Sequence, residues 1–141
     1  MLPLFLFLIL YFLKMIKSRK ILVIEDNLLN QKILFFLLRK KHEIKICSSG
    51  ECALQLFKSE WFDIVLMDLM LPGIDGYETA GRLRVMEKKL YGKRKMIIIA
   101  LTANTLDNDR DRCLASGMND YLPKPFNMQK FNDILASLNF S

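Results

Sequence analysis

An uninterrupted apolar run ends in a carboxylate near the middle of this chain. Residues 64–67 are Ile-Val-Leu-Met, Asp68 follows directly, and Pro72, Gly73 and Gly76 then break the regular backbone. A short apolar run bounded by turn residues is typical of a strand that is buried on both faces of a parallel sheet. Ligands bind at the carboxyl ends of such strands. Asp68 is therefore predicted at the ligand-binding edge, where a carboxylate beside an apolar core requires a cationic partner.

Similar apolar runs alternate with helical segments along the chain. We predict five strands, at residues 20–24, 43–47, 63–67, 96–101 and 119–122, and a helix after each of them. This alternation predicts an α/β fold, in which helices cover both faces of a five-stranded parallel sheet through right-handed crossovers. The length of 141 residues suits one domain. We assign that domain to residues 19–141, with a separate extension at 1–18 and no room for a second domain.

Local signals predict how individual helices pack, begin and end. An amphipathic first helix is predicted from apolar residues at helical spacing, Leu29, Ile33, Phe36 and Leu37. A capping-box pattern at residues 48–51, Ser-Ser-Gly-Glu, opens the second helix. Gly117 is predicted to end the helix at 106–116.

The positive charge of the chain is concentrated near its beginning. The formal net charge is +6, and the only charged residues among the first twenty are Lys14, Lys17, Arg19 and Lys20. Setting these four aside from 21 Lys and Arg leaves 17 basic against 15 acidic side chains. A nucleic-acid binder carries a basic patch on the folded domain, so we expect no nucleic-acid partner.

Residues 2–13 contain no charged side chain, and two interpretations of this segment stay open. As a helix it would be about 18 Å long, against roughly 30 Å for the hydrocarbon core of a bilayer. It is either a short membrane anchor, with the basic cluster at the cytoplasmic face, or the result of a start assigned upstream of Met15. The protein is accordingly expected in the cytoplasm, with membrane contact only through residues 1–20.

Cysteine and histidine content argues against several classes of site. Cys47, Cys52 and Cys113 are an odd number without the spacing of a metal site, and we predict buried or half-buried thiols rather than a redox pair. His42 is the only histidine, so zinc binding and histidine-based catalysis have almost no basis.

Polar residues follow four of the predicted strands. Glu25 and Asp26 follow the first strand, Asp68 the third, Thr102 the fourth and Lys124 the fifth. The carboxyl ends of parallel strands share one edge, so these side chains are expected around one pocket. Clustered carboxylates repel one another unless a cation neutralises them, and Mg²⁺ prefers such oxygen ligands. The alternative for Glu25 and Asp26 is that they only cap the first helix.

Such a pocket suits phosphoryl transfer. A carboxylate can attack phosphorus and form an aspartyl-phosphate. Mg²⁺ would neutralise charge on the phosphoryl group, and an ammonium and a hydroxyl would hold its oxygens. Lys124 and Thr102 supply these two groups.

These motifs, in this order, resemble a two-component response-regulator receiver domain over residues 19–140. The matching stretches are Glu25-Asp26-Asn27 with Asn30-Gln31, Leu66-Met67-Asp68 with Leu71-Pro72-Gly73 and Asp75-Gly76, Ala100-Leu101-Thr102-Ala103, Gly117-Met118-Asn119-Asp120-Tyr121 and Lys124-Pro125-Phe126. The forms around Asn30 and Gly117 are similar to receivers attached to hybrid histidine kinases.

The resemblance implies a flavodoxin-like receiver fold with strand order 2-1-3-4-5. It implies Asp68 as the phosphoacceptor, Thr102 and Lys124 as phosphoryl-binding residues, and a cis peptide bond before Pro125. The implied Mg²⁺ ligands are Glu25, Asp26, Asp68 and the backbone carbonyl of Met70. Thr102 and Tyr121 would form the conformational switch, although Tyr121 is alternatively a plain half-buried strand residue. Met70 and Asn104 occupy positions expected to tune the lifetime of the phosphoryl group.

The resemblance also implies partners. The phosphoryl donor would be a histidine kinase or a histidine phosphotransfer protein. The signal would pass to a protein target through the face made by residues 106–116, 119–122 and 126–138. The chain would not be a classical enzyme, although it would catalyse its own phosphoryl transfer and slow autodephosphorylation. A magnesium-dependent phosphohydrolase is disfavoured because Met70 stands where such enzymes carry a general acid. An unphosphorylated scaffold is disfavoured by the complete acidic site.

Overall fold

The computed structural model describes residues 2–15, 17–103, 107–138 and 140. Five parallel strands form one sheet in the order β2-β1-β3-β4-β5, which confirms the predicted fold class and strand order. The strands are β1 (Lys20–Ile24), β2 (Glu43–Cys47), β3 (Ile64–Asp68), β4 (Ile97–Thr102) and β5 (Asp120–Pro123).

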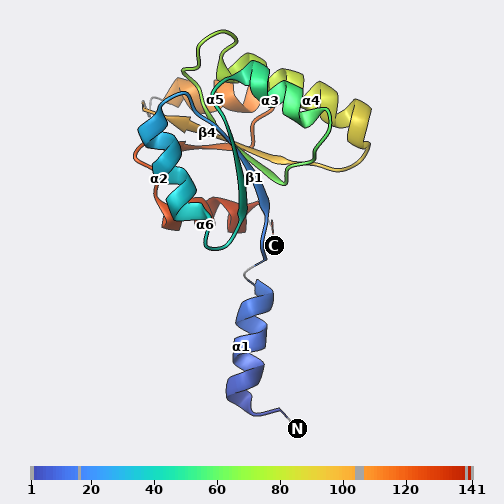
Figure 1. Ribbon diagram of the computed structural model, residues 1–141, viewed down its shortest axis with the longest axis vertical. Coiled ribbons are helices and arrows are strands. Elements are labelled where there is room, and N and C mark those ends of the chain that lie inside the picture. Colours follow the sequence, from blue (N-terminus) through green and yellow to red (C-terminus); the bar gives the residue numbers. More distant parts are fainter. Residues whose placement is uncertain (1, 16, 104–106, 139, 141) are drawn as a thin grey trace.

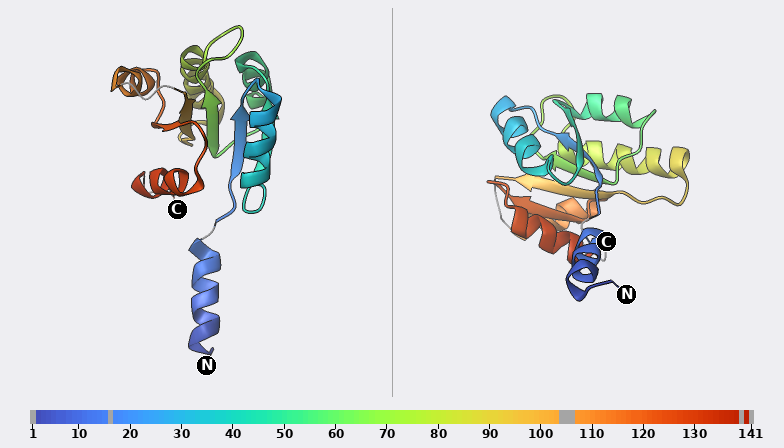
Figure 2. Two further views of the ribbon diagram at one scale, coloured as in Figure 1. Left: turned by 90° about the vertical axis from the view of Figure 1, so that its left-hand side faces the viewer. Right: turned by 60° about the horizontal axis from the view of Figure 1, so that its bottom comes forward.

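Helices cover both faces of this sheet (Figures 1 and 2). They are α2 (Leu28–Leu38), α3 (Gly50–Phe57), α4 (Gly76–Tyr91), α5 (Asp107–Ala115) and α6 (Met128–Ser137). One core lies between the sheet and helices α2 and α6, where Leu34 and Phe131 are buried. The other core lies under α3, α4 and α5, where Phe57 and Leu83 are buried. Since both faces are covered, every residue of β3 is buried, as its apolar sequence predicts.

The predicted apolar face of the first helix is wrong. In α2 the buried residues are Leu34 and Leu38, whereas Leu29, Ile33 and Phe36 are 65%, 45% and 56% exposed. The helix sequence is Leu-Leu-Asn-Gln-Lys-Ile-Leu-Phe-Phe-Leu-Leu, so apolar residues surround it and their spacing selects no face. Contacts at its first turn, described below, orient the helix instead. The consequence is an apolar surface on α2 that the domain leaves uncovered.

The helix ends agree with the predictions in part. Gly117 has a φ of 100°, and Met118 N–H donates to the Cys113 carbonyl at 3.0 Å, so the predicted end of α5 is confirmed. The capping box predicted at residues 48–51 does not form. Ser49 is the N-cap of α3, and Glu51 accepts from Ile74 N–H instead of reaching back to the cap.

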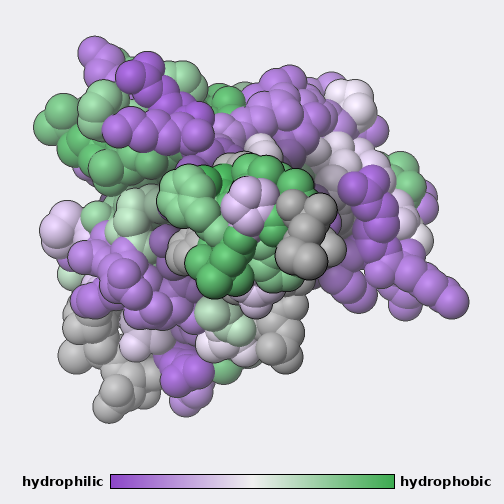
Figure 3. Space-filling model, turned by 90° about the horizontal axis from the view of Figure 1, so that it is seen from below, coloured by the Kyte–Doolittle hydropathy of each residue, from purple (hydrophilic) through white to green (hydrophobic). Residues whose placement is uncertain are grey.

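Helix α1 (Leu4–Met15) lies apart from the sheet and its covering helices (Figures 1 and 2). Its side chains at residues 4–11 are exposed, with Leu4 and Phe5 at 73% and 74%. Figure 3 views this helix close to end-on and shows its apolar surface in front of a largely polar domain surface. Among the described residues, no helix combines the length and apolar character needed to cross a bilayer.

Candidate functional site

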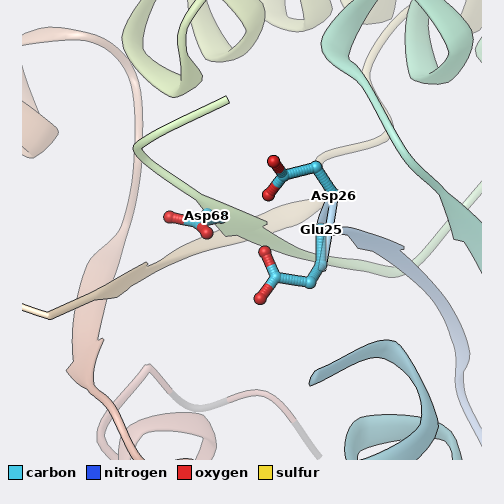
Figure 4. Close-up of side chains that lie close together, drawn as sticks. All are labelled: Glu25, Asp26 and Asp68. Atoms are coloured by element: carbon cyan, nitrogen blue, oxygen red, sulfur yellow. The ribbon is translucent and has the colours of Figure 1, made fainter. Parts of the chain in front are cut away.

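Three carboxylates meet at the carboxyl edge of the sheet (Figure 4). Glu25 and Asp26 directly follow β1, and Asp68 is the last residue of the neighbouring strand β3. One oxygen from each lies within 4.8 Å of the others. Glu25 and Asp68 are buried, and Asp26 is exposed. The expected convergence of these side chains is therefore present in the structure.

The first turn of α2 fixes the Glu25 carboxylate. Asn27 caps the helix by accepting from Asn30 N–H at 3.0 Å. The Asn30 side chain then donates to Glu25 Oε1, and the Gln31 side chain donates to the Glu25 backbone carbonyl. These contacts also set the rotation of α2. Asn30 and Gln31 belong to the stretches that resemble a receiver domain, but their contacts with Glu25 were not predicted, because these contacts depend on how the helix is placed beside β1.

Lys124 brings a positive charge to the same cluster. Its Nζ lies 2.7 Å from Asp68 Oδ2 and 3.4 Å from Glu25 Oε1. The chain carries Lys124 there from the end of β5, where its backbone N–H donates to the Thr102 carbonyl at 2.7 Å. The Lys124–Pro125 peptide bond is cis.

The turn after β3 holds Asp68 from the other side. Met70 N–H donates to Asp68 Oδ1 at 3.0 Å, so both carboxylate oxygens have defined partners. Gly76 lets the start of α4 approach, because a Cβ at this position would lie 2.7 Å from the Asp68 carbonyl oxygen. The Met70 side chain is 82% exposed.

Burial and neighbouring charges shift the pKa values of the two buried carboxyls, Glu25 and Asp68, in opposite directions. Burial, followed by the contact with Asp68, raises the pKa of Glu25 to about 7. Burial alone would also raise the pKa of Asp68, but hydrogen bonds with Glu25, Lys124 and the Met70 N–H outweigh it and lower that pKa. Burial alone would lower the pKa of Lys124, and its contacts with Asp68 and Glu25 raise it. Asp68 is thus held as the ionised carboxylate, while Glu25 is only partly ionised near neutral pH.

The donor set fits a hard divalent cation. Glu25 Oε2 is buried and has no hydrogen-bond partner among the described residues. It belongs to a cluster of three carboxylates with one ammonium in contact, and unpaired buried oxygen is costly. Mg²⁺ binds carboxylate oxygens and keeps several water ligands. These waters would reach the ion from the solvent side of the cluster, where Asp26 is exposed.

Thr102 lies on β4 and Tyr121 on the adjacent strand β5, at different distances from the carboxyl edge of the sheet. Thr102 ends β4 and is 5% exposed, one residue beyond the Leu101 that pairs with Asp68. Tyr121 pairs with Ala100 further back along the sheet, is half-buried, and packs against the core under α5. Asn104 lies outside the described residues. Chemically, the edge offers an ionised carboxylate beside an ammonium, a hydroxyl residue and two further carboxyls that could hold a metal ion.

A comparison with protein families matches residues 21–136 to a model described as the response regulator receiver domain. Hybrid signal transduction histidine kinase H of Dictyostelium discoideum is 41% identical over 122 residues, covering 83% of this chain and 8% of the relative. The osmolarity two-component system protein SSK1 of Saccharomyces cerevisiae is 33% identical over 138 residues, covering 82% of this chain and 19% of the relative. The chain thus spans less than a fifth of the length of these relatives.

Solved structures agree with this match. The receiver domain of sensor histidine kinase PA1611 from Pseudomonas aeruginosa, with magnesium in its active-site cleft, is 37% identical with a TM-score of 0.73. That likeness covers 88% of this chain and 99% of the other. The Ssk1 receiver domain of Saccharomyces cerevisiae, in complex with the histidine phosphotransfer protein Ypd1, is also 37% identical with a TM-score of 0.73. It covers 84% of this chain and 86% of that one.

Proposed function

The chain belongs to the family of response regulator receiver domains of two-component systems, and we propose that Asp68 is its phosphoacceptor. The observation that carries this proposal is the position of Asp68. It is an ionised carboxylate at a strand end, 2.7 Å from the Lys124 ammonium and within 4.8 Å of two further carboxylates. This combination provides a nucleophile with countercharges already in place.

The reaction transfers a phosphoryl group from a phosphohistidine of a partner protein. An Asp68 carboxylate oxygen attacks phosphorus, the bond between phosphorus and the histidine nitrogen breaks, and an aspartyl-phosphate forms. Lys124 and Thr102 bind the oxygens of the transferred group. Lys124 already contacts Asp68, so its ammonium binds the transferred phosphoryl group with little movement of the side chain. The same residues support slow autodephosphorylation by water, and the chain is a phosphoacceptor rather than a classical enzyme.

Glu25, Asp26, Asp68 and the Met70 carbonyl would hold Mg²⁺. When bound, the ion neutralises negative charge on the phosphoryl group and its acceptor. The buried, unpartnered Oε2 of Glu25 supports this assignment. A related receiver from Pseudomonas aeruginosa contains magnesium in its active-site cleft.

The donor would be a histidine kinase or a histidine phosphotransfer protein, and we place its docking surface on α2. Leu28, Leu29, Ile33 and Phe36 leave an uncovered apolar surface on this helix, and Asn30 of its first turn contacts Glu25. A partner on α2 would therefore lie beside the acidic cluster. The related Ssk1 receiver was solved in complex with a histidine phosphotransfer protein.

The output would pass through the face made by α5, β5 and α6. A groove on this face is lined by Arg110, Tyr121 and Asp133, among others. Thr102 precedes the connection to α5, and its movement toward the phosphoryl group would free space for Tyr121 to turn inward. An unidentified protein target would bind this face in one of the two Tyr121 states.

Residues 1–18 would add a tether to the cytoplasmic face of a membrane. The exposed apolar side chains of α1 and the basic residues that follow it support this assignment. If translation begins at Met15 instead, the tether is absent and the receiver is unchanged. In either case the phosphoacceptor chemistry resides in residues 19–141.

Intact-mass analysis after incubation with acetyl phosphate tests the phosphoacceptor proposal. We expect one phosphoryl adduct that requires Mg²⁺, is absent in Asp68→Asn and persists in Asp133→Asn, which alters an exposed carboxylate on α6. An adduct that survives in folded Asp68→Asn would contradict the assignment. If the wild-type protein shows no adduct, a phosphorylated histidine phosphotransfer protein replaces acetyl phosphate as donor, and failure with both donors would overturn the proposal.

A further inference from the structure

Two thiols lie in contact at the end of β2, outside the phosphoacceptor site. The Sγ atoms of Cys47 and Cys52 are 3.0 Å apart. Cys47 is the last residue of β2 and is 2% exposed, whereas Cys52 lies in the first turn of α3 and is exposed. The prediction of buried or half-buried thiols is therefore wrong for Cys52. A disulfide bond is about 2.05 Å long, so closing this gap requires a movement of about 1 Å.

Backbone hydrogen bonds hold both cysteines in place. Cys47 pairs with Ile24 in the sheet, and its carbonyl accepts from Glu25 N–H at 3.0 Å. Cys52 N–H donates to the side chain of the α3 N-cap residue Ser49 at 3.1 Å. The contact between the sulfurs therefore arises from the strand end and the helix cap, and rotation of two side chains can complete it. Their spacing of five residues did not reveal this contact, because it crosses from a strand to a helix.

The two thiols differ in accessibility. Cys52 is open to solvent and to small oxidants. Cys47 is 2% exposed and closed to them. Reaction with an oxidant is controlled by thiolate content and by access. Cys52 is thus the entry point, and Cys47 is the partner that resolves the oxidised sulfur.

We propose that Cys47 and Cys52 form a reversible intramolecular disulfide, with a hydroperoxide as the oxidant. The Cys52 thiolate attacks the O–O bond of hydrogen peroxide, which gives a sulfenic acid on Cys52 and, after proton uptake, one water. The Cys47 sulfur then displaces hydroxide from the Cys52 sulfur, and the thiol proton leaves with that hydroxide as a second water. Two thiols lose two electrons and two protons, and one peroxide becomes two waters. A dithiol reductant reverses the change by thiol–disulfide exchange.

The disulfide would lie next to the acidic cluster, because Cys47 contacts the backbone of Glu25. The Cys47 carbonyl supports Glu25, and the intervening Ser48 hydroxyl accepts from Gln31, which also donates to the Glu25 carbonyl. Oxidation would therefore constrain a segment that positions a proposed metal ligand. This inference does not depend on phosphoryl transfer, since it rests on the two thiols alone.

The test treats the full chain with hydrogen peroxide, alkylates remaining thiols after denaturation, and maps peptides by mass spectrometry. We expect a peptide that contains both Cys47 and Cys52, has lost two hydrogen atoms, resists alkylation and becomes alkylatable after dithiothreitol. Cys113→Ser should retain this product. Cys52→Ser, which changes an exposed side chain, should abolish it and leave Cys47 alkylatable.

Trapping of the intermediate provides a second measurement. In Cys47→Ala, peroxide should leave a sulfenic acid on Cys52 that dimedone labels, whereas wild-type protein should show little label. In wild-type protein, a dimer linked through Cys52 in place of the intramolecular bridge would overturn the proposal. So would a wild-type Cys52 that proceeds to sulfinic acid while Cys47 remains alkylatable.

Discussion

The Lys124 Nζ lies 2.7 Å from Asp68 Oδ2, although 56 residues separate the two along the chain. The parallel sheet creates this contact, because β3 and β5 both deliver the residues at their carboxyl ends to one edge. Lys124 also reaches Glu25 Oε1 at 3.4 Å. One ammonium therefore contacts two carboxyls and lies beside the position where we propose that the phosphoryl group binds.

Lys124→Met should lower the rate of Asp68 labelling by acetyl phosphate by on the order of 100-fold, since a placed countercharge contributes that much to charge stabilisation in a transition state. Intact mass followed over time gives the rate. Lys58→Met is the control, because it removes an exposed lysine whose side chain donates to Gln55, away from the acidic cluster. An unchanged rate in folded Lys124→Met would show that this residue does not bind the phosphoryl group.

Mg²⁺ affinity should rise with pH until about pH 7 and change little above it. Burial raises the pKa of Glu25 to about 7, so below that pH the metal must displace a proton from its ligand. The apparent affinity should change by about tenfold per pH unit in this range, which corresponds to one released proton. Calorimetry in buffers of different ionisation enthalpy measures both quantities.

Glu25→Gln is the matched variant for this measurement. It should bind Mg²⁺ more weakly, with most of the pH dependence removed. Without metal, the raised pKa of Glu25 stabilises the wild-type fold below the ordinary pKa of a glutamate, and this contribution is lost as the pH rises through about 7. If the Mg²⁺ affinity of the wild-type protein did not change between about pH 5.5 and pH 7, the raised pKa of Glu25 would be contradicted.

The sequence predicts the sheet and its functional edge because the strands are short, almost wholly apolar and punctuated by polar residues. Asp68 is informative because it places a carboxylate directly after the apolar residues 64–67, and this abrupt change marks the end of a strand. The rotation of α2 was not predictable from periodicity, since apolar residues occupy both its buried and its exposed positions. Contacts of Asn30 and Gln31 with Glu25 determine that rotation, and these are tertiary contacts.

The corrected face of α2 can be tested by stability. Leu34 is 3% exposed and Ile33 is 45% exposed on the same helix. Leu34→Ala should lower the free energy of unfolding by about 2–4 kcal/mol, because it removes buried methyl groups and leaves a cavity. Ile33→Ala should change it by less than about 1 kcal/mol. Urea denaturation measures both, and equal losses would place Ile33 in the core.

The same surface can be tested as the donor site. Ile33→Ser should slow phosphoryl transfer from a phosphorylated histidine phosphotransfer protein and leave labelling by acetyl phosphate unchanged, since the small donor needs no docking surface. Val85→Ser is the control, because Val85 is an apolar residue on α4 that is 68% exposed. Equal slowing with both donors would indicate damage to the site rather than loss of docking.

The N-terminal segment should carry all membrane binding. The full chain should sediment with phosphatidylserine-containing vesicles, and residues 19–141 should remain in the supernatant. Lys17→Glu should reduce binding several-fold, since each basic residue near an anionic surface contributes about 1 kcal/mol. Lys58→Glu, on the folded domain, should have no such effect. Vesicle binding by residues 19–141 would locate the contact on the receiver itself.

Arg84 joins α4 to the residues just before two strands, β4 and β5. Its guanidinium donates at 2.8 Å to the carbonyls of Gly117 and Met96 and to Asn119 Oδ1. It also pairs with Glu87 at 2.9 Å, and Glu87 is 1% exposed. Breaking a buried pair from one side typically costs about 3–5 kcal/mol, because the remaining charge is left without its partner.

Arg84→Ala should therefore lower the free energy of unfolding by about 3–5 kcal/mol. Arg82→Ala, on the same helix, should cost less than about 1 kcal/mol, since Arg82 and its partner Glu78 are both exposed. Adding Glu87→Gln to Arg84→Ala should recover part of the loss, because the neutral amide no longer leaves a buried charge. Urea denaturation of the two single variants and the double variant gives the coupling energy. Purely additive losses would mean that Arg84 acts through its three carbonyl and amide contacts, and that its ion pair with Glu87 contributes nothing to stability.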